Sequence, residues 1–199
     1  MMKHHITDNI TKGKERNLKA FSKAMFNLIE FKSFDDITVS EICDESHFPR
    51  ATFYNYFYDK FDLMNYCWHL MSKDIDMDIH SDMKSEEVLL NAFDGLYSLF
   101  EDNQVSVKKI LRHNTCESQL ITSFSNFLNQ SIKAEMSRCL NNKDLSLPVG
   151  LISNHYSNTI MLLLEWIFVD NNKMTIDKAH MYLKSLLNHQ FESPLNVIH

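Results

Sequence analysis

Apolar residues recur at three- and four-residue steps along most of this chain, the spacing that gathers them on one face of an α-helix. Glycine and proline seldom interrupt the pattern, since the sequence holds only three of each, and sheets and turns need more of both. The chain is therefore expected to be all-α, with long helices and short connections. The predicted helices cover about residues 14–31, 39–45, 49–55, 60–75, 88–100, 105–112, 117–140, 149–169 and 175–189.

The stretch over residues 38–63 differs from the rest because its first two helices are short. Thr38 suits an N-cap, and Glu41 three residues later completes a capping box. Phe48 is an apolar residue directly after the turn, and Pro49 suits the first turn of the next helix. Phe53 and Phe57 are expected to belong to the core. Two short helices, a tight turn and an apolar plug predict a helix-turn-helix.

Residues 15–63 resemble the DNA-binding region of the TetR (tetracycline-repressor-like) family of bacterial transcriptional regulators. The residues that carry the resemblance are Ala20, Phe26, Phe34, Thr38, Val39, Ile42, Phe48, the block 49–57, Lys60, Asp62 and Leu63. A weaker resemblance joins residues 158–167 and the last helix to the C-terminal region of Firmicutes members of this family. The resemblance implies a three-helix helix-turn-helix domain with an N-terminal arm over residues 1–63. It also implies a helical bundle over residues 64–199 that binds an effector and dimerises.

The resemblance places the DNA-binding residues on and around the second short helix. They are Thr38, Pro49, Arg50, Ala51, Thr52, Tyr54, Asn55, Tyr56 and Lys60. Arg50 suits bidentate pairing with guanine, and a phosphate contact is the alternative. Tyr54 and Tyr56 suit phosphate contacts or packing better than base reading. Lys60 at a helix start is poorly placed for the helix dipole, and this misfit favours a phosphate contact over a solvated lysine.

Three features of this region leave alternatives open. Thr38 either caps its helix only or also offers its hydroxyl to a phosphate. His47 stands in the turn, where the family commonly has glycine, and histidine adopts the left-handed conformation less readily than glycine. Some local strain or a slightly altered turn is therefore expected. The N-terminal arm, residues 1–13, either reaches a DNA groove or is a disordered end.

The charge of the chain qualifies the DNA-binding prediction. The formal net charge is −6, with 9 Lys and Arg against 10 Asp and Glu in residues 1–63 and 11 against 16 in residues 64–199. Long-range attraction of DNA is therefore weak, and phosphate contact depends on locally placed cations. These cations are Lys12, Lys14, Arg16, Arg50 and Lys60.

An effector pocket is expected in the second domain. Its candidate residues are Trp68, Phe93, Tyr97, Phe100, His113, Phe124 and Phe127. An aromatic stripe at helical spacing is more often plain core, so both interpretations stay open. His113 or His155 is a candidate polar anchor or haem ligand, against the commoner role of a core or surface histidine. No cofactor or metal site is expected, because no two histidines have i, i+4 spacing and the four cysteines form no C-x-x-C pair.

The leading hypothesis is a homodimeric repressor that leaves a palindromic DNA operator when a small-molecule or protein effector binds, with the last two helices forming the dimer interface. One alternative is a family relative that has lost DNA binding and acts through protein partners. A helical-bundle enzyme is the other, but the sequence holds no glycine-rich phosphate loop, Glu-x-x-His motif or nucleophile elbow. No apolar run of about 18 residues and no signal peptide is found, so a cytoplasmic protein without membrane contact is expected.

Overall fold

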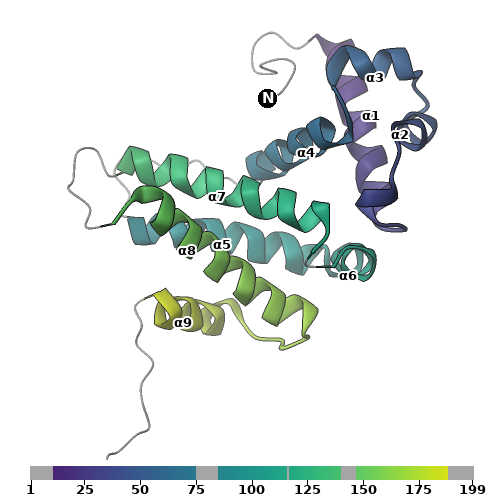
Figure 1. The fold of residues 1–199 in the computed structure, drawn as a ribbon. Helices are drawn as coiled ribbons and strands as arrows, with labels where there is room; N and C mark the ends of the chain where they lie inside the picture. The colour runs from purple at the N-terminus through teal and green to yellow at the C-terminus, as the bar shows by residue number, and fades with distance from the viewer. Residues whose placement is uncertain (1–10, 75–84, 116, 140–146, 188–199) are drawn as a thin grey trace, which may run out of the picture. The chain divides into compact units, whose positions relative to one another are not determined.

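The computed structural model describes residues 11–74, 85–115, 117–139 and 147–187 (Figure 1). All regular secondary structure in these residues is helical, as the hydrophobic pattern predicted. The elements are α1 (Lys12–Ile29), the 3₁₀ turn η1 (Phe34–Asp36), α2 (Val39–Ser46), α3 (Arg50–Tyr56), α4 (Lys60–Asp74), α5 (Ser85–Asp102), α6 (Gln104–His113), α7 (Gln119–Cys139), α8 (Val149–Leu164), the π-helical turn η2 (Glu165–Val169) and α9 (Ile176–Leu187). The chain divides into two compact units. The first unit holds Met1–Asp78 and Asn103–Phe127, and the second holds Ile79–Asp102 and Leu128–His199.

Most helix boundaries fall close to the predicted ones. α1 begins two residues earlier than expected because Thr11 caps it, its hydroxyl accepting a hydrogen bond from the Lys14 N–H at 3.4 Å. The prediction of one regular helix over residues 149–169 is wrong at its end, where the last five residues form the π-helical turn η2. Most of the predicted N-terminal arm, and most of the connection between the predicted helices 117–140 and 149–169, lies outside the described residues.

The core of the first unit is an aromatic cluster centred on Phe21 of α1. The Phe21 ring centroid lies 5.4 Å from that of Phe53, 5.6 Å from that of Phe48 and 6.2 Å from that of Phe57. Phe21, Phe53 and Phe57 are fully buried. Aromatic pairs in edge-to-face geometry add to the stabilisation from burial alone. The prediction that Phe53 and Phe57 belong to the core is confirmed, and the cluster fixes α3 against α1.

The second unit is built on α5, the later part of α7, α8 and α9. Phe93 and Tyr97 of α5 are buried, and the Phe168 ring of η2 lies 5.3 Å from the Tyr97 ring. The Tyr97 hydroxyl donates to the carbonyl of Met174 at 2.6 Å, so α5 is tied to the segment before α9. His180 of α9 contacts Asp94 of α5 through its Nε2 atom. Polar side-chain contacts therefore supplement the apolar core of this unit.

The expectations about membrane-spanning helices, metal sites and cysteines concern residues of which the structure describes most. None of their helices combines the length and the hydropathy that crossing a membrane requires. Within the same ranges, no three His, Cys, Asp or Glu side chains gather in a way that could hold a metal ion. Cys43 and Cys67 are buried free thiols, and they fill the core as small hydrophobic residues. Cys116 and the side chain of Cys139 lie outside the described part.

Candidate nucleic-acid interface

The entrance to α2 is a complete capping box. The Thr38 hydroxyl accepts a hydrogen bond from the Glu41 N–H at 3.3 Å, and the Glu41 carboxylate accepts one from the Thr38 N–H at 2.9 Å. The Thr38 hydroxyl also donates to the same carboxylate oxygen at 2.9 Å. The capping role predicted for Thr38 is confirmed. A phosphate contact by its hydroxyl remains a prediction, and would compete with Glu41.

The Glu41 carboxylate is also the partner of Lys32. The Lys32 ammonium lies 2.8 Å from the second Glu41 oxygen. The hydrogen bond from Lys32, followed by those from the backbone and the side chain of Thr38, lowers the pKa of Glu41 from 4.5 to about 2. Glu41 is therefore ionised throughout the physiological range and holds α2 to the loop that precedes it.

The turn between α2 and α3 places His47 in the left-handed conformation, with φ 56° and ψ 34°. The His47 N–H donates to the carbonyl of Asp44 at 3.2 Å, and the Phe48 N–H donates to the carbonyl of Cys43 at 3.1 Å. This pair of bonds is a Schellman motif, which usually has glycine at the left-handed position. The expected strain is therefore located at His47, and the turn keeps its geometry.

The helix α3 presents one face to the core and one to solvent. Pro49 is its N-cap residue, so the helix begins at Arg50, one residue later than predicted. Phe53 is buried, whereas Arg50, Ala51, Tyr54 and Asn55 are exposed and Thr52 is half-buried. The exposed side chains are suited to hydrogen bonds and apolar contacts with base edges in a DNA groove. Because the buried Phe53 anchors the opposite face of α3, the helix that carries these exposed side chains is held in place.

A contact between α2 and α3 was not expected from the sequence. A guanidinium nitrogen of Arg50 donates to the hydroxyl of Ser40. Ser40 lies in the first turn of α2, and a single serine there gives no pattern that would reveal this role. Ser40 therefore orients the side chain that the sequence makes the strongest candidate for base contact.

The two tyrosines of α3 differ in their surroundings. Tyr54 is exposed, with its ring edge-on to Phe53 at 5.5 Å. Tyr56 is half-buried, and its hydroxyl oxygen accepts a hydrogen bond from the Asn17 amide of α1 at 3.2 Å. Tyr56 therefore combines packing with a polar contact, while Tyr54 has the exposure that a phosphate contact needs.

Lys60, the first residue of α4, is engaged in the structure. Its ammonium donates to the carbonyls of Phe34 at 2.8 Å, Asp35 at 2.7 Å and Ile37 at 2.9 Å. An ammonium has three N–H groups, so all three are used. Burial lowers the pKa of Lys60, while the charges of Asp35 and Asp36 oppose that shift. The predicted phosphate contact of Lys60 remains a prediction, and it requires the ammonium to release at least one carbonyl.

Four of the candidate effector residues lie in the first unit. Trp68 and Phe124 are buried with ring centroids 5.1 Å apart, and the Trp68 indole N–H donates to the Ser123 hydroxyl at 3.0 Å. Phe127 is half-buried with its ring edge-on to His69. His113 is exposed at the end of α6. The structure thus brings Trp68 and Phe124 together and leaves His113 at the surface.

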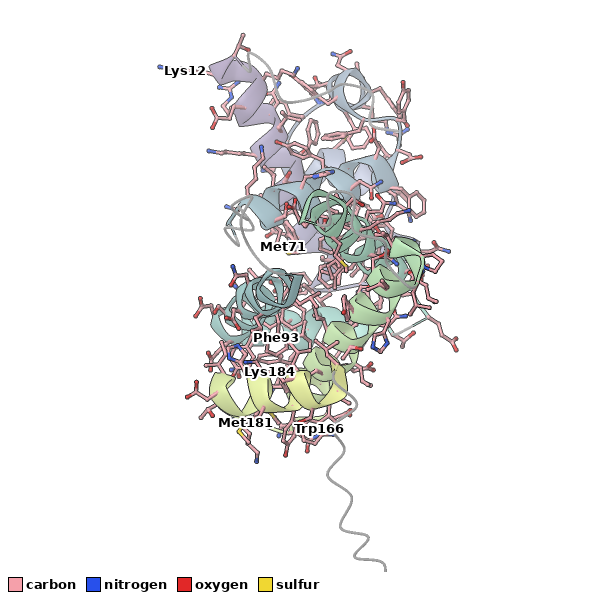
Figure 2. The ribbon with its side chains drawn as sticks, turned by 90° about the vertical axis from the view of Figure 1, so that its left-hand side faces the viewer. Lys12, Met71, Phe93, Trp166, Met181 and Lys184 are labelled. Carbon is pink, nitrogen blue, oxygen red and sulfur yellow. The ribbon has the colours of Figure 1, made fainter. Side chains whose placement is uncertain are left out.

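The other three candidates lie on α5 in the second unit. Phe93 packs against Tyr97 at 6.0 Å between ring centroids, and Phe100 packs against Phe168 at 5.6 Å. Phe93 is labelled in Figure 2. Its ring also lies 6.1 Å from the His180 ring of α9. These side chains form a connected aromatic group, and its polar atoms are the Tyr97 hydroxyl and the His180 ring.

The described helices define a class of protein: an all-helical chain with an N-terminal helix-turn-helix followed by a helical second part. The chain has the fold of TetR-family transcriptional regulators. In sequence comparison, no family model and no curated protein matches it.

Three solved structures illustrate the likeness. A TetR-family regulator from Syntrophomonas wolfei is 19% identical, with 94% of this chain and 100% of that chain covered and a TM-score of 0.63. A TetR regulator from Streptococcus agalactiae is 19% identical, with 87% and 94% covered and a TM-score of 0.58. The regulator FadR from Bacillus subtilis, solved with stearoyl-CoA, is 16% identical, with 87% and 97% covered and a TM-score of 0.52. These regulators share the fold with this chain.

Proposed function

We propose that this chain is a sequence-specific DNA-binding transcriptional regulator. The observation that carries the proposal is α3: a short helix anchored by Phe53, directly after a tight turn, with Arg50, Ala51, Tyr54 and Asn55 exposed. Such a helix is the part of a helix-turn-helix that enters the major groove. Residues 1–63 then form the DNA-binding domain and residues 64–199 the effector-binding and dimerisation domain. Since its target is DNA, the protein would act in the cytoplasm of a bacterial cell.

The test is selection of DNA fragments from a random pool, followed by a salt-titrated binding assay on the selected sequence. Arg50→Ala should reduce the preference for the selected sequence over random DNA by roughly 1–3 kcal/mol, which is about 5- to 150-fold. Arg112→Ala, which removes an exposed arginine from α6, is the matched control and should leave the preference unchanged. A wild-type protein without sequence preference, or an Arg50→Ala variant that binds like the wild type, contradicts the proposal.

We propose further that the protein is a homodimer through α8, η2 and α9. The exposed apolar side chains of these elements are Leu151, Leu162, Trp166, Val169, Met181 and Tyr182. Figure 2 shows Met181 on α9 and Trp166 near that helix. The Trp166 ring is 5.8 Å from the Tyr182 ring of α9. A two-fold dimer would place two α3 helices about 34–36 Å apart, one DNA turn, to match a palindromic operator.

Sedimentation of charge-substituted variants tests the dimer. Met181→Glu places a charge in the proposed interface and should shift the protein to the monomer, because an unpaired charge is costly to bury. Lys184→Glu on the same helix is the control and should leave the dimer intact. A Met181→Glu dimer as stable as that of the wild type would place the interface elsewhere.

The third part of the proposal is an effector whose binding releases the protein from DNA. The DNA-bound protein is expected to repress transcription. The aromatic side chains of Phe93, Tyr97 and Phe100 suit an apolar ligand, and a regulator with the same fold was solved with stearoyl-CoA. Stearoyl-CoA is therefore the first probe, with coenzyme A and stearate as controls. Release of DNA by stearoyl-CoA alone supports an acyl-CoA effector, and no response to any of the three argues for another small molecule or a protein.

A second candidate function is a regulator that acts through protein partners without binding DNA. The observation in its favour is the charge of residues 1–63, where 10 acidic residues outweigh 9 basic ones. The structure adds that Lys32 and Lys60 are engaged within the protein. The fragment selection decides between the two, since this second candidate predicts no selected sequence.

A further inference from the structure

The side chain of Asn114 connects three backbone segments. It follows α6 directly and is fully buried. Its amide oxygen accepts a hydrogen bond from the Phe34 N–H at 2.8 Å. Its amide nitrogen donates to the carbonyl of Ile110 at 2.9 Å and to that of Ile29 at 3.5 Å. Only the oxygen can accept and only the nitrogen can donate, so these partners fix the orientation of the amide.

The 3₁₀ turn η1 is held from its other side by Lys60. The Asn114 amide oxygen accepts a hydrogen bond from the Phe34 N–H, while the Lys60 ammonium donates to the carbonyls of Phe34, Asp35 and Ile37. Thr38, the N-cap of α2, comes immediately after Ile37. The backbone that leads into α2 is therefore fixed by two side chains from distant parts of the sequence.

Polar contacts link α6 to the end of α1. No side chain of α6 is fully buried. The Lys109 ammonium of α6 lies 2.9 Å from the Glu30 carboxylate at the end of α1. Hydrogen bonds from Ser106 and then Lys109 lower the pKa of Glu30. The end of α6 is thus attached to the end of α1 and to η1 through Asn114, Lys109 and Ser106.

We propose that Asn114 is a positioning residue for DNA binding. By accepting a hydrogen bond from the Phe34 N–H, it sets the direction in which the chain leaves η1 and enters α2. It thereby sets the orientation in which α2 and α3 contact DNA. The inference rests on the proposed function. Without the amide, the buried Phe34 N–H loses its acceptor and the Ile29 carbonyl loses this donor, while the Ile110 carbonyl keeps the backbone N–H of residue 114. An unpaired buried N–H forces a rearrangement or a local opening. Of the two side chains that fix η1, only Lys60 then remains, and α6 keeps its contacts with Glu30 but loses its hydrogen bond to η1.

The test is Asn114→Ala in the full-length protein, measured on the selected operator at a temperature at which circular dichroism shows every variant folded. The expected result is a loss of operator affinity of about tenfold. The slope of log affinity against log salt should stay the same, because no phosphate contact is removed. Amide exchange of Phe34 should accelerate as well. Asn129→Ala, which removes a side-chain contact with Ser153 in the second unit, should leave operator affinity unchanged.

A purely structural role for Asn114 gives a different result, namely a lower melting temperature with wild-type operator affinity of the folded protein. That result overturns the proposal. If Asn114→Ala does not fold, Lys109→Met carries the test, with Lys108→Met on the exposed side of α6 as its control. Weaker operator binding by Lys109→Met than by Lys108→Met is expected, and equal binding overturns the inference. A wild-type protein that selects no operator would instead refute the proposed function itself.

Discussion

The ammonium of Lys60 lies 2.7 Å from the backbone carbonyl oxygen of Asp35, a residue 25 positions earlier in the chain. With the carbonyls of Phe34 and Ile37 it completes a set of three acceptors around one cation. A lysine at the start of a helix thus neutralises the carbonyl ends of the turn before α2. Its misfit with the dipole of α4 is offset by acceptors from another element.

Lys60→Met should lower the free energy of unfolding by about 2 kcal/mol, since hydrogen bonds from a charged group contribute more than neutral ones. Three carbonyls lose the ammonium, and of these the Phe34 carbonyl keeps the Ile37 N–H. Urea titration followed by circular dichroism measures the change. Lys23→Met replaces an exposed lysine of α1 and should alter stability by no more than about 0.5 kcal/mol. If Lys60→Met is as stable as the wild type but binds DNA weakly, the ammonium serves DNA and not the fold.

His47→Gly should stabilise the protein by about 0.5–1 kcal/mol, because glycine adopts the left-handed conformation without the steric cost that a side chain carries. His47→Val should destabilise it by a larger amount, since a β-branched residue is strained at φ 56°. Thermal unfolding of the two variants measures both changes. A glycine variant less stable than the wild type would show that the imidazole makes a stabilising contact.

The capping carboxylate of Glu41 gives the stability a pH dependence of known sign. Its pKa is lowered from 4.5 to about 2 in the folded protein, so its contribution is complete above pH 4.5 and is lost as the pH falls toward 2. Glu41→Gln should remove this part of the acid sensitivity, with a modest effect because the pair with Lys32 is partly exposed.

Two measurements check the Glu41 prediction. NMR titration of the carboxyl carbon should give a midpoint well below 4.5 in the wild type, and Lys32→Met should move it upward, since the hydrogen bond from Lys32 is the largest cause of the shift. A midpoint near 4.5 in the wild type would mean that the capping box is not formed in solution.

The thiol of Cys67 should be unreactive in the folded protein. Burial raises its pKa to about 12, so almost no thiolate exists at neutral pH. In a variant with Cys116 and Cys139 replaced by serine, a thiol reagent at pH 8 should label Cys67 only when urea unfolds the chain. Burial also raises the pKa of Cys43, which should likewise be protected. Rapid labelling without urea would reveal a local opening between α1 and α4.

Features that depend on neighbouring residues were predictable from the sequence. The capping box needs only Thr38 and Glu41, three residues apart, and their side-chain chemistry determines the bonds they form. The left-handed turn at His47 follows from where α2 must end. The aromatic spacing of α3 likewise placed Phe53 and Phe57 in the core, because a helix of fixed period can present only one side to α1.

Features that depend on distant residues were not predictable. Asn114 accepts a hydrogen bond from a residue 80 positions earlier in the sequence, and no local pattern around a single asparagine indicates such a contact. The same holds for Lys60, whose acceptors are backbone atoms and leave no mark in the sequence. The candidate effector residues were grouped by aromatic character alone, and the fold distributes them between two units.

The π-helical turn η2 determines the angular phase of the chain beyond α8. The Asp170 N–H reaches back to the Glu165 carbonyl at 3.1 Å, one residue farther than in an α-helix, which rotates everything that follows by about 100° relative to a regular continuation. This phase puts Ile167 and Phe168 inside and leaves Trp166 and Val169 outside. The number of residues in η2 is therefore more constrained than their identity. An apolar substitution within η2 can be accommodated, whereas a one-residue deletion would rotate the residues that follow it by about 100° and turn Phe168 away from the core.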